Sequence, residues 1–430
     1  MNGRTQMAEI KDLKYNPFRP NDIIHTGMFV GRIDELDTIE RCLFQAKHGN
    51  PLHFIAQGER GIGKSSLLFI VKMLANGMLP PATAAEPFRF LSVSVDLGGC
   101  STQIDVVRKI ARGLRKEIAS RQVIKEKAKA FWDWITNWEV LGVSYNKDSI
   151  AFDMEEIVEQ FVENIAVFCD AAESDIDGIL FLIDEADRPP VEAALGSYLK
   201  MISERLKWRS CERVIFGLAG LPTLLGKLRE SHESSPRLFH TMLLEPLEME
   251  ERKRVVRNGI EEANKKNSIA TKITDEAVDF LAELSEGYPH FIQQFAYSAF
   301  QQDTDNIIDD EDVGNGAFKE GGALTQLGDK FFNDMYHARV SSEEYRRVLD
   351  TMADHGDGWV SRKTIIKESG VSEANVTNAL RALKMKEVII QDESQRGLYR
   401  LPTNSFAAWI NAIRAARAKS DVAKGARFEG

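Results

Sequence analysis

A loop suited to holding phosphate is the part of the sequence whose residue types and spacing best support chemistry. The pattern G-x-x-x-x-G-K-[ST] is matched by Gly58-Glu59-Arg60-Gly61-Ile62-Gly63-Lys64-Ser65. The loop follows the apolar run 52–56 and precedes a helix-like run that begins at Ser66, which is the context the pattern requires. Glycines let successive backbone N–H groups turn toward an anion. We expect Lys64 to contact the β- and γ-phosphates of a nucleotide and Ser65 to bind Mg²⁺; the alternative is a glycine-rich surface turn.

Two adjacent acids at the end of an apolar run form the second chemical feature. The run Gly178 to Ile183 is followed directly by Asp184 and Glu185. Such a run is typical of a buried parallel strand whose carboxyl end opens onto a site. Asp184 is expected to support the Mg²⁺, and Glu185 to orient and polarise the water that attacks the γ-phosphate. The alternative is a pair of solvated carboxylates at a strand end.

Composition sets outer limits on the kind of protein. A chain of 430 residues favours two to four domains, and the net charge of −10 argues against a protein coated in nucleic acid, although it allows a local basic surface. No apolar run approaches the roughly 18 residues that span a bilayer, so we expect no membrane segment. The four scattered cysteines indicate reduced thiols, and together these features predict a cytoplasmic location.

Other segments predict the elements that position the loop and the acids. Further buried strands are expected over 88–97 and 214–220, and a helix over 34–44 after Phe29-Val30-Gly31-Arg32. The Trp-rich stretch 131–138 follows several basic residues, so it is either an aromatic core stripe or a contact for nucleic acid or a partner. A hairpin is expected over 142–148.

The loop, the acid pair and the segment Val30-Gly31-Arg32 together resemble AAA+ and STAND ATPases. The order of elements from residue 16 to 409 is similar to the origin-recognition-like branch of these proteins. This resemblance implies an α/β P-loop NTPase fold with a three-layer αβα parallel sheet, followed by an all-α helical lid and a winged-helix domain. It also implies ATP or ADP with Mg²⁺ as the ligands, and a role for Val30, Gly31 and Arg32 beside the adenine.

Four further positions take their expected roles from the same resemblance. Arg237 matches an arginine that reaches the nucleotide of a neighbouring subunit; its alternative is a structural ion pair. Pro289 and His290 match the lid motif, so His290 is expected either near the γ-phosphate, as a pH-sensitive contact, or as a helix-start histidine bonded to backbone. The position that usually carries a polar residue near the γ-phosphate falls on Ala219 or Gly220.

The expected domain boundaries follow shifts in pattern and composition. They are an extended N-terminal arm at 1–28, the α/β domain at 29–247 with an insertion at 116–148, the lid at 248–302, an acidic linker and connecting helix at 303–340, the winged helix at 341–420 and a tail at 421–430. The winged-helix region has 13 Lys/Arg and 10 Asp/Glu between residues 341 and 420, which gives it a weakly basic character within an acidic chain.

Duplex DNA is one possible partner of the winged helix. Its second helix is expected to turn Val371, Val376, Leu380 and Leu383 toward the core. This leaves DNA-contacting candidates on the outer face and at the wing tip, namely Asn375, Asn378, Arg381 and Arg396. The alternative is a module that contacts protein or latches the lid.

These features predict an ATP-binding and ATP-hydrolysing switch that couples nucleotide state to the docking of the lid and winged helix. Its turnover is expected to be slow or stimulated by a partner, and the candidate partners are a second copy of the chain, duplex DNA and an unidentified protein. Two alternatives stay open: a DNA-binding regulator, mobile-element or defence component with little turnover, and a nearly inert nucleotide-binding scaffold.

Overall fold

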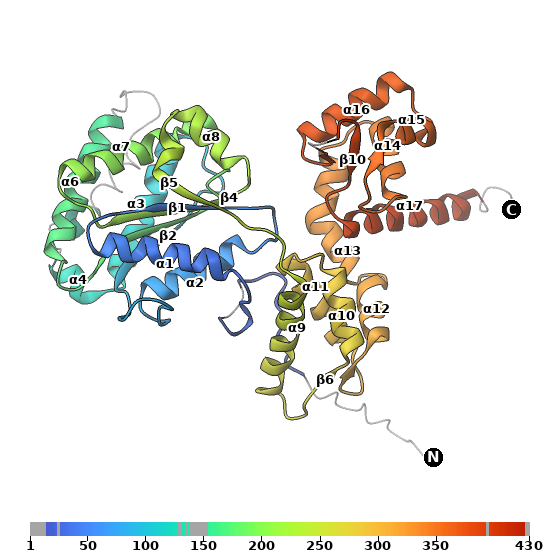
Figure 1. Ribbon diagram of the computed structural model, residues 1–430, viewed down its shortest axis with the longest axis horizontal. Helices are drawn as coiled ribbons and strands as arrows, with labels where there is room; N and C mark the ends of the chain where they lie inside the picture. The colour runs from blue at the N-terminus through green and yellow to red at the C-terminus, as the bar shows by residue number, and fades with distance from the viewer. Residues whose placement is uncertain are drawn as a thin grey trace, which may run out of the picture. The chain divides into compact units, whose positions relative to one another are not determined.

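The computed structural model describes residues 14–23, 26–127, 129, 131–134, 136, 154–392 and 395–425. The chain forms two compact units (Figure 1). The first is Ile23–Pro246, and the second joins the segment that ends at Asp22 to the segment that begins at Leu247. The chain therefore crosses between the units twice, at residues 22–23 and at residues 246–247.

A five-stranded parallel sheet with the order β2-β3-β4-β1-β5 is the centre of the first unit. Its strands are β1 (His53–Gln57), β2 (Phe90–Asp96), β3 (Gly178–Asp184), β4 (Val214–Gly220) and β5 (Phe239–Leu243). The strands β1, β3 and β4 are buried along almost their whole length, as their continuous apolar runs predict. The strand β4 packs closely at Gly217, where an added Cβ would lie 2.2 Å from the ring of Phe54.

Helices cover both faces of this sheet, which gives the predicted three-layer fold (Figure 1). One face carries α1 (Ile33–Lys47) and α2 (Lys64–Ala75). The helices of the other layer are α3 (Gln103–Ala119), α4 (Gln122–Lys127), α6 (Met154–Ala171), α7 (Leu195–Trp208) and α8 (Leu224–Ser231). Short 3₁₀ turns lie at Thr26–Met28, Val191–Ala193 and Ser235–Leu238.

The described aromatic residues of the stretch after α4 pack in or against the apolar core. The ring of Phe131 lies 5.4 Å from that of Trp134 and 4.9 Å from that of Phe168 on α6. This packing agrees with the interpretation as a core stripe. Trp138 and the hairpin expected over 142–148 both lie outside the described residues.

The second unit begins with a helical lid of four helices and a two-stranded parallel ribbon. These are α9 (Met249–Asn264), β6 (Lys272–Ile273), α10 (Asp275–Leu284), α11 (Pro289–Gln302), β7 (Ile307–Ile308) and α12 (Asp310–Phe318). Thr274 accepts a hydrogen bond from the N–H of Ala277 and caps α10, as its position in the sequence predicts.

The acidic first part of the segment 303–340, which was expected to be a linker, contains a strand and a helix that pack on the lid. Residues 307–308 pair with β6, and α12 packs against α10 and α11. The acids take defined roles: Asp309 caps α12 by accepting from the N–H of Asp312, and the acids of the first turn face the positive end of the helix.

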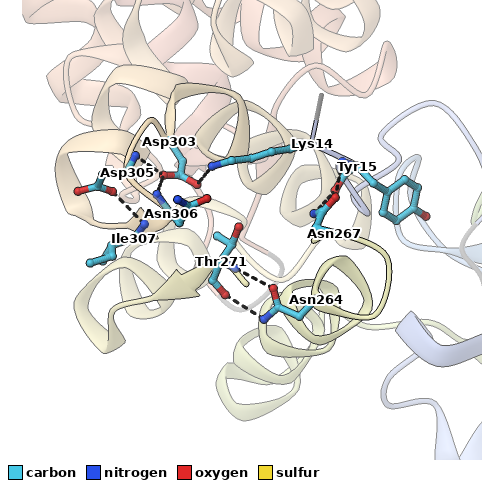
Figure 2. A network of polar contacts seen from close by, with 9 residues as sticks. All are labelled: Lys14, Tyr15, Asn264, Asn267, Thr271, Asp303, Asp305, Asn306 and Ile307. Carbon is cyan, nitrogen blue, oxygen red and sulfur yellow. Dashed lines mark hydrogen bonds and ion pairs between the residues drawn. The ribbon is translucent and has the colours of Figure 1, made fainter. Parts of the chain in front are cut away.

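The N-terminal arm is bound to this lid. Figure 2 shows Lys14 reaching the buried carboxylate of Asp303, at 3.0 Å, and the backbone of Tyr15 paired with Asn267. Phe18 is only 2% exposed and fills the space beside Gly259, where an added Cβ would lie 2.3 Å from its ring. The unit that contains the arm extends along this segment to Asp22, whereas the arm is predicted to run to residue 28.

The rest of the second unit is a winged helix. The connecting segment is helical over α13 (Ala323–Leu327) and then takes wider π-type turns to Ala338. It is followed by α14 (Glu343–Ala353), β8 (Val360–Ser361), α15 (Arg362–Ser369), α16 (Glu373–Met385), β9 (Ile390–Gln391), β10 (Leu398–Arg400) and α17 (Asn404–Gly425). The small sheet is antiparallel with the order β8-β10-β9. Since α17 continues to Gly425, the tail predicted to begin at residue 421 is helical at its start.

Candidate functional site

The phosphate loop connects the carboxyl end of β1 to the start of α2. Its first residue is fixed to β4, because the N–H of Gly58 donates to the carbonyl of Gly220 at 3.2 Å. Gly61 and Gly63 have φ values of 80° and 98°, in the left-handed region that favours glycine. Gly63 is the residue immediately before α2, so the positive end of that helix opens onto the loop. The strand, loop and helix therefore have the arrangement that the pattern requires.

Lys64 lies across this loop. Its ammonium group donates to the carbonyl of Gly58 at 2.7 Å and to that of Glu59 at 2.8 Å. Burial lowers the pKa of Lys64, although the nearby carboxylate of Asp184 acts in the opposite direction. The ammonium group is thus held over the loop by two backbone carbonyls.

A hydroxyl and a carboxylate meet beside the loop. The Oγ atom of Ser65 donates to Oδ2 of Asp184 at 2.5 Å, and the other carboxylate oxygen of Asp184 accepts from the N–H of Glu185. Mg²⁺ is usually held by one or two protein oxygens together with substrate phosphates and water. The pair therefore fits this ion. Among the residues that the structure describes, no cluster of three or more His, Cys, Asp or Glu side chains is placed to hold a metal ion without a substrate.

Glu185 follows β3 in a strained conformation that turns its side chain out of the strand. Its φ is 50°, which is uncommon for a residue with a side chain. The carboxylate lies over Gly98, where an added Cβ would be 2.4 Å from Oε2. The same oxygen lies 3.7 Å from Nε of Arg188 in a half-exposed ion pair. Glu185 is therefore accessible at the edge of the sheet where the loop opens.

Asp96 is a third acid at this edge that sequence reasoning did not select. It ends β2 and is the register partner of Asp184 at the end of β3. Its Oδ1 accepts from the N–H of Gly98 at 2.6 Å. The signal was present in the sequence, since Asp96 closes an apolar run as Asp184 does.

The strand β4 ends in Ala219 and Gly220, neither of which has a polar side chain. Ala219 and Gly220 are both buried, and the carboxylate of Asp187 occupies the space beside Gly220. Asp187 is used structurally, because Oδ1 accepts from the N–H of Leu221 at 3.0 Å.

The segment ahead of α1 reaches the loop through Arg32. The guanidinium donates from Nη2 to the carbonyl of Ile62 at 3.1 Å and from Nη1 to Glu35 at 3.4 Å. Gly31 and Arg32 both have positive φ. Val30 and Gly31 are half-buried. The structure thus brings Arg32 to the predicted site, in contact with its backbone.

Arg237 is exposed in the turn before β5. The alternative role of a structural ion pair is not supported, because Arg237 has no ion pair with any residue that the structure describes. Whether it reaches a neighbouring subunit stays a prediction.

Pro289 and His290 begin α11 in the second unit. The ring of His290 packs 4.6 Å from that of Phe331, and its Nε2 is buried with no hydrogen-bond partner among the residues that the structure describes. Burial lowers the pKa of His290 to about 4. Burial therefore favours the uncharged ring in the free protein, and whether His290 contacts a γ-phosphate stays a prediction.

The candidate DNA-contacting residues divide into two groups. Asn378, Arg381 and Arg396 are exposed, whereas Asn375 is half-buried and donates to Glu344 at 2.9 Å. The expected outward orientation is thus wrong for Asn375. Beside them a groove of about 420 Å³ is lined by Thr377, Leu380, Arg381, Lys384, Met385, Gln391 and Tyr399. All four expected core positions, Val371, Val376, Leu380 and Leu383, are buried.

The sheet, loop, helical lid and winged helix together have the fold of solved ORC proteins. The ORC2 protein of Aeropyrum pernix has this fold. Its ADPNP–ADP complex has a TM-score of 0.55 with 13% identity over 94% of this chain and 99% of that one. Its ADP form has a TM-score of 0.52 with 14% identity over 93% of this chain and 97% of that one. At such low identity the likeness shows a shared fold.

The chain is also similar in sequence to a curated protein. It is an uncharacterized HTH-type transcriptional regulator of Methanocaldococcus jannaschii, 26% identical over 289 residues that make up 65% of each protein. The chain thus matches somewhat less than two thirds of the length of this relative. No protein-family model matches the sequence.

Proposed function

We propose that the protein is an ATP-dependent molecular switch that binds ATP·Mg²⁺ at the phosphate loop and hydrolyses it slowly. The observation that carries the proposal is the contact of Ser65 with Asp184 directly beside a loop whose cation is Lys64. In this arrangement the loop N–H groups and Lys64 bind the β- and γ-phosphates, and Ser65 and Asp184 hold the Mg²⁺. The ion supplies charge neutralisation at the phosphates.

Glu185 is the proposed residue for hydrolysis. Its half-exposed carboxylate stands next to Asp184 at the open edge of the sheet, where it can orient a water molecule toward the γ-phosphate. The absence of a polar side chain at Ala219 and Gly220 removes one usual contact to that phosphate. Slow turnover is therefore part of the proposal.

Two variants test binding and turnover separately. Lys64→Ala removes the charged donor, and we expect ATP affinity measured by calorimetry to fall by about a hundredfold. Glu185→Gln keeps the shape and the neighbouring ligands, so ATP should still bind while hydrolysis falls by about 10²-fold or more. Lys207→Ala and Glu192→Gln, which are exposed in the same unit, are the matched controls. Unchanged hydrolysis in Glu185→Gln would exclude its role, and retained affinity in Lys64→Ala would exclude the site.

Self-association is the proposed use of Arg237. An exposed arginine with its planar fork suits a contact to the phosphates of an adjoining copy. ATPase activity per molecule should then rise with protein concentration and lose this rise in Arg237→Ala. Activity that is independent of concentration would exclude the role.

A second candidate function is ATP-regulated binding of duplex DNA through the winged helix. It is supported by exposed Arg381 and Asn378 on α16, by Arg396 at the wing, and by the HTH-type name of the curated relative. Binding that weakens with salt and changes between ATP and ADP would support it. Equal DNA affinity with ATP and with ADP would show that the bound nucleotide does not control DNA binding.

A further inference from the structure

The side chain of Arg32 is nearly enclosed although it belongs to a surface segment. It is 8% exposed, and its two hydrogen-bonded groups are both parts of this protein, the carbonyl of Ile62 and the carboxylate of Glu35. Gly31 and Arg32 have φ values of 74° and 63°, so two successive left-handed residues turn the chain into α1. That turn sets Arg32 against the phosphate loop at an energetic cost in backbone strain.

The carbonyl that Arg32 binds belongs to the peptide that joins Ile62 to Gly63. A trans peptide is planar, so its C=O and N–H groups point in opposite directions. With the carbonyl of Ile62 held on the side of Arg32, the N–H of Gly63 faces away from it. In a loop that binds phosphate through main-chain donors, the direction of this N–H decides whether it is a ligand.

The loop needs such a restraint because it is rich in glycine. Gly61 and Gly63 flank Ile62, and glycine passes between backbone conformations at little cost. The peptide between Ile62 and Gly63 is therefore free to rotate unless something fixes it. The side chain of Ile62 is fixed, since it is 1% exposed and packs against Gly58. Arg32 supplies the matching restraint on the carbonyl.

We propose that Arg32 is a positioning residue that fixes the Ile62–Gly63 peptide with its N–H toward the phosphates, and that Glu35 fixes Arg32. This inference rests on the proposed nucleotide site and gives Arg32 a role different from contact with the adenine. Glu35 suits its part because it lies in the first turn of α1, is 17% exposed, and accepts from Nη1 while Nη2 remains directed at the loop. A planar guanidinium can hold both partners at once, which an ammonium group does less well.

Inorganic tripolyphosphate separates the two roles because it has no base. Calorimetry with Mg²⁺ should show that Arg32→Ala lowers the affinities for ATP and for tripolyphosphate by the same factor. We expect roughly tenfold or more, because one charge-assisted hydrogen bond is lost. The ratio of ATP affinity to GTP affinity should not change. Arg32→Lys should recover part of the loss for both ligands. Unchanged tripolyphosphate binding with a collapsed ATP/GTP ratio would overturn the proposal and assign Arg32 to the base.

Further variants protect the test from indirect effects. Arg41→Ala is the matched control, since Arg41 is exposed on the same helix and donates to the carbonyl of Asp37 within it. Glu35→Gln leaves Arg32 in place and should cause a smaller loss of the same kind, so it decides the question if Arg32→Ala does not fold. A wild-type protein that binds neither ligand would refute the proposed function itself. A wild-type protein that binds both, with Arg32→Ala and Glu35→Gln unchanged, would refute only the positioning role.

Discussion

The two units hold their polar side chains in place by different means. In the unit Ile23–Pro246, the acids and the loop follow strands of one parallel sheet: the register of β2 and β3 pairs Asp96 with Asp184, and Ser65 at the start of α2 donates to Asp184. In the second unit, the comparable polar contacts join the arm to the lid across 252 to 289 positions of sequence. The first arrangement is rigid because strands set it, and the second depends on one short segment staying bound. The comparison predicts that the two units respond differently to the same kind of change.

The largest difference should follow removal of the arm's aromatic anchor. Phe18→Ala deletes a ring that is 2% exposed, which costs about 3–5 kcal/mol in typical cores. We expect hydrogen exchange followed by mass spectrometry to rise throughout the lid while the peptides of the parallel sheet keep their protection. Phe318→Ala, in the same unit but 55% exposed, is the control. Equal loss of protection in both units would mean that they unfold together, and the comparison would fail.

Acidification should affect both units, each through one histidine. Burial lowers the pKa of His53 in the sheet and of His290 in the lid from 6.5 to about 4. Between these values the unfolded chain binds protons that the folded chain does not, so stability falls as pH drops from 6.5 toward 4. A shift of 2.5 units corresponds to at most about 3 kcal/mol for each group, at 1.36 kcal/mol per unit.

The variant His290→Phe sharpens this expectation. A phenyl ring replaces the uncharged imidazole beside Phe331, so the lid should lose part of its sensitivity to acid while the sheet keeps the contribution of His53. Hydrogen exchange at pH 6.5 and pH 4.5 measures both units in one sample. An unchanged pH response of the lid would show that His290 is not the group responsible.

The smallest effects are expected on the outer face of α16. Arg381→Ala should weaken duplex DNA binding by about 1 kcal/mol and reduce the slope of log affinity against log salt by about one. Asn375→Ala should change affinity less, because its amide is already bonded to Glu344. Fluorescence anisotropy over a salt series measures both. A larger loss for Asn375→Ala than for Arg381→Ala would contradict the orientation seen here.

The sequence predicted most of what depends on neighbouring residues. The loop 58–65, the strand before Asp184 and the cap at Thr274 are signals contained within a few positions, and the structure has each of them. The core of the winged helix was equally predictable from the sequence, because helical periodicity places Val376, Leu380 and Leu383 on one face. The identity of the phosphate-site residues as ligands stays a prediction.

What sequence reasoning missed depends on partners that are distant in the chain. The acidic, glycine-containing composition of residues 303–322 predicted a linker. In the structure, β7 is stabilised by pairing with β6, and α12 is stabilised by packing on α10 and α11. The half-buried position of Asn375 is set by Glu344, 31 residues away, and the uncharged state of His290 by burial beside Phe331. No local pattern contains these contacts. Asp96 is the exception, since a strand that closes on an acid was visible.

The docking of the arm also has a consequence for the order of events during translation. Lys14 leaves the ribosome 289 residues before Asp303, and at about 5–20 residues per second this is an interval of roughly 15 s to 1 min. Gly259, against which Phe18 packs, is also synthesised only after β5, so the whole parallel sheet is completed before this contact can form. The segment that is made early is thus among the last to reach its final place, and a nascent chain held by a chaperone at this aromatic residue would still be free to form the sheet.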